Sequence, residues 1–188
     1  MRVLSGVSKD VKLKIWRRGS GRATPDEIKE LTFEIVGSDI ESCRFLDLFA
    51  GTGGVGIEAL SRGAERCTFV EDSARMIKVL KANLAQCELG EQAEIVQFDA
   101  FNTIVTLNNR QHVFDVVFAD PPDRGDLAVR AIRLVDRYSI QKPKSLIFVC
   151  HSAKVEMPSE LTTLALFRRN EIKGEMLSAY CLANRAAP

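Results

Sequence analysis

The chain lacks the segments that direct a protein to or through a membrane. None of its apolar runs reaches the roughly 18 residues that a transmembrane helix requires. The opening residues, MRVLSGVSKD, do not contain the continuous apolar stretch of a signal peptide. We therefore expect a cytoplasmic protein with no membrane partner.

Metal-binding patterns are missing as well. The five cysteines are scattered without a CxxC pair, and His112 and His151 are the only histidines. Structural zinc sites need Cys and His clustered at short spacings. The sequence therefore predicts no metal ion.

Positive and negative charges nearly cancel over the whole chain, but they are unevenly distributed along it. The net charge is +1, from 26 Lys and Arg against 25 Asp and Glu. Residues 1–22 nevertheless hold seven Lys and Arg against Asp10 alone, a net charge of +6. Such a segment is typical either of a surface that meets a polyanion or of a solvated terminus. We divide the chain into a basic N-terminal hairpin or arm, 1–22, and one domain, 23–188.

The N-terminal segment and its junction with the domain show local structural signals. Polar and apolar residues alternate in Arg2–Ser5 and Val11–Trp16, which predicts a hairpin. Thr24, Pro25 and Glu27 have the spacing of a helix N-terminus, with Thr24 and Glu27 forming a capping box.

Beyond this helix, strand and helix patterns alternate. Apolar strands are expected at Arg44–Phe49, Arg66–Val70, Glu94–Phe98, Val113–Ala119 and Ser145–His151. Helical spacing marks three of the segments between them, namely Val55–Arg62, Ser73–Cys87 and Asp126–Tyr138, and Phe101–Asn108 is expected to be a short helical or irregular piece. This alternation predicts an α/β fold with a doubly wound, mostly parallel sheet. Thr163–Arg169 and Leu177–Ala183 are expected to close it as an antiparallel hairpin.

A glycine-rich turn follows the first of these strands. Residues 51–56 read GTGGVG, a G-x-G-x-x-G pattern between a strand and a helix. Gly51, Gly53 and Gly56 allow a tight turn and a close approach of backbone to ligand. Glu71 ends the next strand, where its carboxylate can accept hydrogen bonds from both hydroxyls of a ribose. These features fit NAD as well as S-adenosylmethionine (SAM). The alternative is that the glycines only pack the helix on the sheet.

Two further acids favour SAM. Asp47 lies four residues before Gly51, within reach of the methionine ammonium group of SAM, whereas an acid there would face the pyrophosphate of NAD. The alternative for Asp47 is a buried acid that accepts hydrogen bonds from the loop. Asp99 follows the third strand and can accept from the adenine amino group, although Asp is also common there as a helix cap.

Asp120, Pro121 and Pro122 end the strand Val113–Ala119. An exocyclic amine of a nucleobase is a poor nucleophile because its lone pair is delocalised into the ring. The Asp120 carboxylate and the rigidly directed carbonyl of Pro121 can together accept both amine protons, so that the nitrogen aims its lone pair at a methyl donor. A stacked base would first have to be extruded. The alternative is that Asp-Pro-Pro only terminates the strand.

These motifs together resemble the RsmD-type 16S ribosomal RNA guanine-N2 methyltransferases. The resemblance covers Asn83 and, along the chain, the segments MRVLSG, RATPDEIKELTFEI, FLDLFAGTGGVGIEALSRGA, FVE ending at Glu71, and FDVVFADPP. It implies a class I SAM-dependent methyltransferase fold, SAM as cofactor, and a guanine in the RNA of the small ribosomal subunit as target.

The resulting site hypothesis has three parts. The catalytic residues are Asp120, Pro121 and Pro122. The residues expected to hold SAM are Asp47, Phe49, Gly51, Gly53, Gly56, Glu71, Asp72, Asp99 and Ala100. The residues expected to contact RNA phosphates are Lys9, Lys12, Arg17, Arg18 and Arg22.

The chain departs from the family pattern at two places. The family places Tyr or Phe after Asp-Pro-Pro, where its ring can stack on the extruded base, and this chain has Asp123. Phe101 and Tyr138 are candidates to replace that ring. The family's N-terminal Gly-x-x-Lys-Gly-Arg is Gly-Val-Ser-Lys-Asp-Val at residues 6–11, which loses a glycine and a cation.

Other functions remain compatible with these residues. An Asp-Pro-Pro motif can also orient the acceptor in methyl transfer to adenine N6 in DNA or RNA, or to a protein amide. A SAM-binding or RNA-binding assembly factor without catalysis is a third hypothesis, and a nicotinamide oxidoreductase a more distant one. We expect a monomer.

Overall fold

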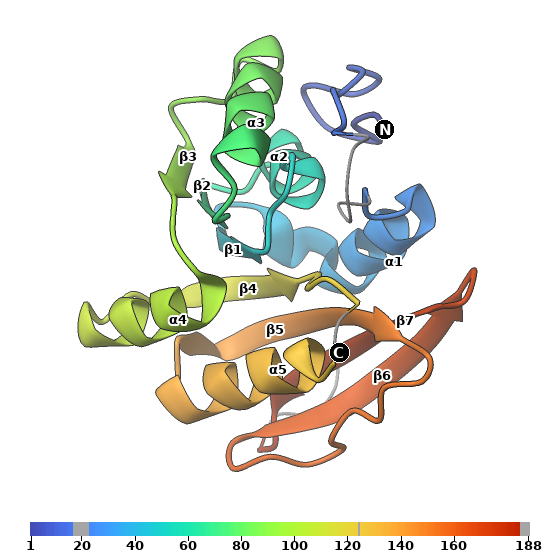
Figure 1. The fold of residues 1–188 in the computed structure, drawn as a ribbon, viewed down its shortest axis with the longest axis vertical. Coiled ribbons are helices and arrows are strands. Elements are labelled where there is room, and N and C mark those ends of the chain that lie inside the picture. The colour runs from blue at the N-terminus through green and yellow to red at the C-terminus, as the bar shows by residue number, and fades with distance from the viewer. Residues whose placement is uncertain (17–22, 124, 185–188) are drawn as a thin grey trace.

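The structure is a computed structural model that describes residues 1–16, 23–123 and 125–184. Seven strands form one sheet in the order β3-β2-β1-β4-β5-β7-β6 (Figure 1). The strands are β1 (Arg44–Leu48), β2 (Arg66–Val70), β3 (Ala93–Val96), β4 (Phe114–Ala119), β5 (Gln141–Ser152), β6 (Leu164–Ile172) and β7 (Glu175–Leu182). The helices are α1 (Asp26–Val36), α2 (Gly54–Ser61), α3 (Ala74–Gln86), α4 (Ala100–Asn109) and α5 (Leu127–Tyr138), with a 3₁₀ turn at Gly37–Ile40.

The pairing of the strands confirms the predicted doubly wound sheet. Strands β3, β2, β1, β4 and β5 are parallel, and β7 and β6 add an antiparallel hairpin at one edge. The hairpin turns at Lys173 and Gly174, which both have positive φ. None of the described helices combines the length and apolarity of a membrane span.

The near-continuous apolar strands are explained by helices on both faces of the sheet. Consecutive residues of a strand point to opposite faces. Accordingly, Phe45 of β1 packs in one core with residues of α1, α2 and α3, while Leu46 packs in a second core with residues of α4 and α5. Helices therefore pack on both faces of the sheet.

The start of α1 differs from the sequence prediction. Pro25 has extended backbone angles and occupies the N-cap position, and no side chain caps the helix. The Thr24 hydroxyl instead donates to Asp120, and Glu27 pairs with Lys173. The predicted capping box is therefore wrong, because both of its side chains have tertiary partners.

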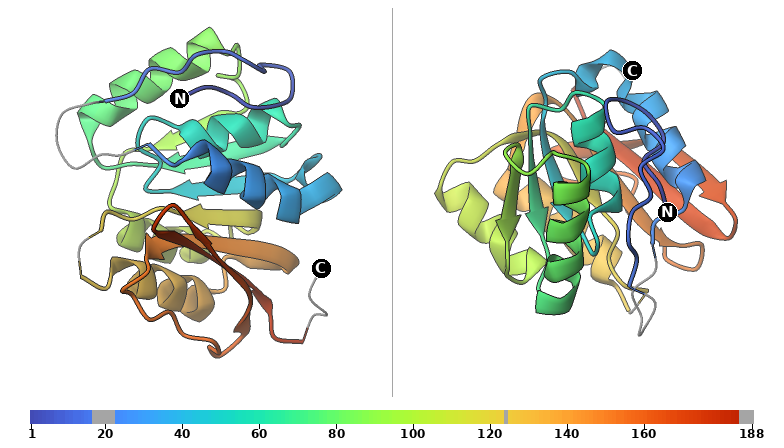
Figure 2. Two further views of the ribbon diagram at one scale, coloured as in Figure 1. Left: turned by 90° about the vertical axis from the view of Figure 1, so that its right-hand side faces the viewer. Right: turned by 90° about the horizontal axis from the view of Figure 1, so that it is seen from above.

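The N-terminal segment forms a hairpin that packs on the domain. Arg2 and Lys12 form an antiparallel bridge, as the alternation predicts. Figure 2 shows this segment lying across α2 and α3. The carboxylate of Glu58, fully buried on α2, accepts from the backbone N–H of Leu4 at 2.7 Å and of Ser5 at 3.0 Å.

A buried lysine completes this attachment. Lys29 of α1 is fully buried, and its Nζ donates to the carbonyl of Arg2 at 2.8 Å. Its Nζ also lies 3.0 Å from the partly exposed Asp26 carboxylate and 3.9 Å from the buried Glu58 carboxylate. Arg62 contacts the Glu58 carboxylate at 2.7 Å. Buried charges are costly without partners, so the hairpin, α1 and α2 depend on one another through Glu58.

We predict that Glu58→Gln lowers the free energy of unfolding by about 3 kcal/mol, since it removes a buried negative charge that accepts from the hairpin backbone and pairs with Arg62. Urea denaturation monitored by circular dichroism measures the change. Glu34→Gln, on the exposed side of α1, is the matched control and should change stability by less than about 0.5 kcal/mol. Equal stability of the two variants would contradict the role of Glu58.

Candidate functional site

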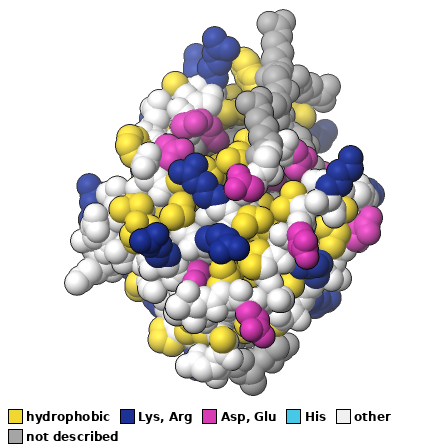
Figure 3. All heavy atoms as spheres, turned by 60° about the horizontal axis from the view of Figure 1, so that its bottom comes forward, with side chains coloured by type: hydrophobic (Ala, Val, Ile, Leu, Met, Phe, Trp, Pro, Cys, Tyr) yellow, Lys and Arg dark blue, Asp and Glu magenta, His cyan; other side chains and the backbone are white. Residues whose placement is uncertain are grey.

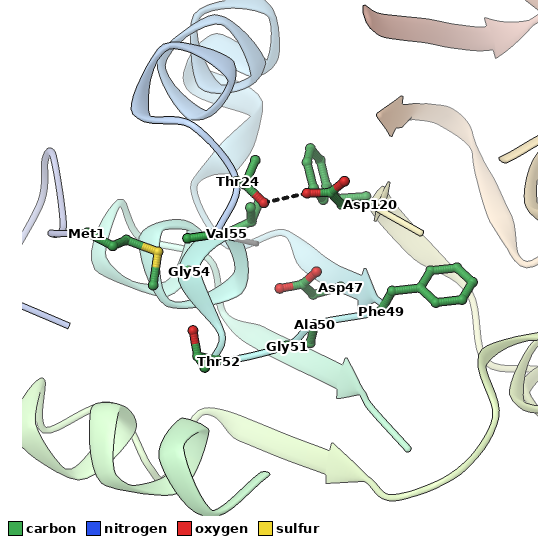
Figure 4. Close-up of a pocket in the computed structure, with 12 residues that line it drawn as sticks. Met1, Thr24, Asp47, Phe49, Ala50, Gly51, Thr52, Gly54, Val55 and Asp120 are labelled. Carbon is green, nitrogen blue, oxygen red and sulfur yellow. Dashed lines mark hydrogen bonds between the residues drawn. The ribbon is translucent and has the colours of Figure 1, made fainter. Parts of the chain in front are cut away.

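The carboxyl ends of β1 and β4 meet at the point where the winding of the sheet reverses. Ligands of doubly wound folds bind in the crevice at such a point. A pocket with about 370 Å³ of empty space, partly open to solvent, lies here (Figure 4). Its lining consists of Met1, Ala23, Thr24, Asp47, Phe49, Ala50, Gly51, Thr52, Gly54, Val55, Phe118 and Asp120.

The turn between β1 and α2 includes residues with positive φ, a backbone conformation that favours glycine. Phe49, Gly51 and Gly53 all have positive φ, at 63°, 56° and 86°. A Cβ on Gly53 would lie 2.2 Å from Leu80 Cδ1, whereas a Cβ on Gly51 would meet open space at the pocket. Gly53 is therefore needed for packing and conformation, and Gly51 for its conformation at the edge of the pocket.

Gly56 packs α2 against the sheet, which is the alternative that the sequence left open for these glycines. It is absent from the described residues that line the pocket, and a Cβ there would lie 2.3 Å from Phe69 Cε1. Its small size lets α2 approach β2, and its N–H donates to Asp47 Oδ2 at 2.9 Å. Gly56 thus acts on the pocket through Asp47.

Asp47 lies at the back of the pocket and is only 3% exposed. Burial raises its pKa to about 8, and the nearby Asp120 and Glu71 carboxylates act in the same direction. The hydrogen bond from Gly56 opposes this rise without cancelling it. The structure therefore shows a buried acid that the loop partly satisfies and that also borders the ligand space.

Glu71 supports the glycine turn from β2. One carboxylate oxygen accepts from the N–H of Gly51 at 2.8 Å, and the other accepts from the N–H of Ser73 at 2.8 Å. Each oxygen retains a second lone pair with which it can accept from a ligand. Burial, together with the neighbouring Asp72, raises the Glu71 pKa. Asp72 itself is exposed.

Asp99 caps a helix, which was one of its two expected roles. It occupies the N-cap of α4 and accepts from the N–H of Asn102 at 2.9 Å. Ala100 begins the helix and is buried. Both follow β3, at the same edge of the sheet as the pocket, but neither belongs to its described lining.

Asp120 follows β4 and faces Thr24 across the pocket. The Thr24 hydroxyl donates to Asp120 Oδ2 at 2.7 Å (Figure 4). The Asp120 N–H lies 3.5 Å from the carbonyl of Leu48, which ties the end of β4 to the end of β1. Pro121 is buried and Pro122 exposed, and both lie outside the described lining.

Thr24 is the site residue that sequence reasoning missed. Its position before Pro25 and three residues ahead of Glu27 fits a local cap, and that local signal concealed the tertiary contact. The one sequence signal that could have marked this threonine is its place in the segment RATPDEIKELTFEI, which is part of the family resemblance.

The ring that the family places after Asp-Pro-Pro is not replaced by Phe101 or Tyr138. Phe101 is 7% exposed, with the Arg130 guanidinium 4.0 Å from its ring centre and Phe49 against its edge. Tyr138 is the last residue of α5, at the end away from Asp120. Asp123 is exposed.

The predicted RNA contacts are only partly within the described chain. Lys9 and Lys12 are exposed on the N-terminal hairpin. Arg17, Arg18 and Arg22 lie outside the described residues.

The charge of the pocket selects the kind of ligand that it can hold. Of the described residues that line it, those with a charged side chain are Asp47 and Asp120, both acids. A third acid, Glu71, accepts a hydrogen bond from the N–H of Gly51, which lines the pocket. Such a pocket favours a cationic ligand and disfavours the pyrophosphate of a dinucleotide.

Comparison with known proteins agrees with this geometry. Residues 1–181 match the family described as Conserved hypothetical protein 95. The chain is 37% identical over 169 residues to YlbH of Bacillus subtilis, covering 90% of this chain and 92% of YlbH. It is 37% identical over 150 residues to ribosomal RNA small subunit methyltransferase D of Haemophilus influenzae, covering 79% of this chain and 77% of that protein.

The solved structure of YhhF from Escherichia coli has the same fold, with a TM-score of 0.84 and 26% identity, and the match covers 98% of this chain and 99% of YhhF. Fold, motifs and relatives thus agree over nearly the whole length. The chain belongs to the ribosomal RNA small subunit methyltransferase D (RsmD) family.

Proposed function

We propose that this protein transfers the methyl group of SAM to the exocyclic N2 of a guanine in 16S rRNA of the small ribosomal subunit. The observation that carries the proposal is the position of Asp120, which borders the same acidic pocket as the glycine turn. Ligand and acceptor amine would thus meet at the junction of β1 and β4. The names of the family relatives support rRNA as the substrate.

The pocket fits SAM. When bound, SAM supplies an electrophilic methyl group on a positively charged sulfonium, and it carries an ammonium group as well. Asp47 would accept from the ammonium, and Glu71 would accept from the ribose hydroxyls. Phe49, Gly51 and Gly53 would shape the pocket floor, and Asp72, Asp99 and Ala100 would complete the adenosine side. The acidic lining is what such a cation requires.

Asp120 would orient the acceptor amine. Its carboxylate and the Pro121 carbonyl would accept the two amine protons, and Pro122 would keep that carbonyl rigid. Positive charge develops on the nitrogen as the new bond forms, so the two acceptors stabilise the transition state more than the ground state.

Thr24 would act as a positioning residue for Asp120. Its hydroxyl donates to Oδ2, which restricts rotation of the carboxylate before the base arrives. A hydrogen bond to a charged group contributes about 1.5–3 kcal/mol. A carboxylate fixed in advance need not be ordered in the transition state.

The proposed reaction can be tested directly. Labelled SAM should transfer its methyl group to small subunits that lack this modification, and digestion should yield N2-methylguanine. Asp120→Ala should lower the rate about 10³-fold because it removes an acceptor of developing charge, while calorimetry should show SAM affinity within about threefold of the wild type.

Naked 16S rRNA, DNA and a protein fraction are the comparison substrates. Label in adenine or protein, with none in guanine, would overturn the proposed target. Absence of label from every acceptor, with SAM binding intact, would favour a non-catalytic assembly factor.

The second prediction concerns the pKa of Asp47. Its ionised form should bind the SAM ammonium, and burial places its pKa at about 8. Below that pH the carboxyl must lose a proton on binding, so SAM affinity should rise up to about tenfold per pH unit between pH 5.5 and 7.5. Asp47→Asn should bind weakly and without this slope in calorimetry, and an equal slope in both proteins would rule out the assignment.

The third prediction concerns Thr24. Thr24→Val keeps the shape of the side chain but removes its donor, and should lower kcat at least about tenfold with little change in SAM affinity or Tm. Thr24→Ser retains the hydroxyl and should recover most of the rate. A merely structural role would instead lower Tm and SAM binding together, and Thr24→Ser would then give no selective recovery of kcat.

A further inference from the structure

Helix α3 carries a row of cations on its exposed side. Its exposed charged residues are Arg75, Lys78 and Lys81, and each of them is positive. The side chains of Ile77, Leu80 and Leu84 on the other side of the helix are buried in the core. The charged residues therefore do not help to pack the helix on the sheet.

The N-terminal hairpin is fixed beside this helix by hydrogen bonds to two of its side chains. Asn83 of α3 is fully buried, and its side chain accepts from the N–H of Lys14 at 2.8 Å and donates to the carbonyl of Lys14 at 3.0 Å. Gln86 donates to the carbonyl of Lys12 at 3.0 Å. These bonds use the main chain of the hairpin, so the side chains of both lysines remain exposed.

The hairpin and the helix thus present one basic surface, which we call the α3 surface. It comprises the exposed residues Lys9, Lys12, Lys14, Arg75, Lys78 and Lys81. No ion pair within the described part of the chain involves any of the six. The neighbouring acid Asp10 pairs with Arg2, and Asp72 and Glu88 mark the two ends of α3.

The α3 surface begins at the pocket. The segment that enters α3 runs through Glu71 and Ser73, and the Glu71 carboxylate holds the N–H of Gly51 in the pocket lining. On the hairpin side of the α3 surface, Met1 also lines the pocket. A polyanion lying on these cations would therefore pass the opening into which the acceptor base must be placed.

We propose that α3 is part of the rRNA-binding surface and that Arg75, Lys78 and Lys81 contact phosphates of the same RNA strand as the lysines of the hairpin. This inference rests on the proposed function, since it takes RNA of the small subunit as the partner. It extends the RNA contacts beyond the N-terminal segment to a helix of the methyltransferase domain.

Helix α5 provides a control with the same number of cations on the opposite face of the sheet. Its exposed charged residues are Arg130, Arg133 and Arg137. Helices α3 and α5 contribute to different cores, one on each face. Figure 3, viewed from the side of α5, shows Lys and Arg mixed with Asp and Glu rather than a surface of one sign.

The test measures how the affinity for RNA depends on salt. The logarithm of the binding constant falls with the logarithm of salt concentration by about 0.7 per phosphate contact for single strands. Small subunits lacking the modification are titrated with wild type, with Arg75→Gln/Lys78→Gln/Lys81→Gln, and with Arg130→Gln/Arg133→Gln/Arg137→Gln. Glutamine keeps helix propensity close to that of Lys and Arg, and calorimetric SAM binding confirms that each variant is folded.

The α3 variant should lose about 2 from the magnitude of the salt slope, and the α5 variant should keep the wild-type slope. An unchanged slope in the α3 variant, or an equal loss in both variants, would overturn the inference while leaving the proposed function intact. If wild type itself failed to bind the subunits at low salt, the proposed rRNA substrate would fail instead.

Discussion

The close packing of the glycine turn after β1 and of α2 against their neighbours is the constraint on which the site depends. A side chain at Gly53 would collide with Leu80, and one at Gly56 would collide with Phe69. Because residue 56 is glycine, α2 lies close enough to the sheet for the Gly56 N–H to reach Asp47. Because residue 53 is glycine, the turn packs against α3 with positive φ, and the Gly51 N–H of the same turn reaches Glu71. Residues of the same turn line the pocket. Loss of either glycine would therefore move two carboxylates as well as the backbone.

Placing several acids around a largely buried pocket is electrostatically unfavourable until a ligand neutralises them. Burial and the neighbouring Asp120 and Glu71 raise the Asp47 pKa to about 8. The energy that opposes ionisation in the empty pocket becomes attraction when a cation enters, because the surrounding dielectric is low. This gives a physical reason for a pocket with no positively charged side chain among its described lining residues. It also explains why the glycine motif, which fits a dinucleotide equally well, would not hold a pyrophosphate in this chain.

Most of the fold could be predicted from the sequence because its signals are local. Apolar runs such as 113–119 and the helical spacing between them determine a parallel sheet with helices on both faces, and the position of Asp120 follows from the strand that it ends. The prediction failed at Thr24, whose sequence position suits a helix cap but whose hydroxyl has a tertiary partner instead. Thr24 satisfies a local cap pattern, and only the fold brings it to Asp120. The basic row on α3 escaped for a related reason, since its proposed role depends on a hairpin that packs beside it through a contact between residues 69 positions apart.

Helix α1 connects the two parts of the molecule that must act together. Thr24, just before the helix, holds the carboxylate proposed to orient the base. Lys29, one turn into the helix, holds the N-terminal hairpin through Arg2 and the Glu58 carboxylate. The hairpin in turn lies against α3, whose cations face the proposed RNA path. Close-packed elements resist independent displacement, and the contacts of Thr24 and Lys29 place α1 between the hairpin and Asp120. In this fold, the surface proposed to bind RNA and the carboxylate proposed to align the acceptor base are therefore connected through α1.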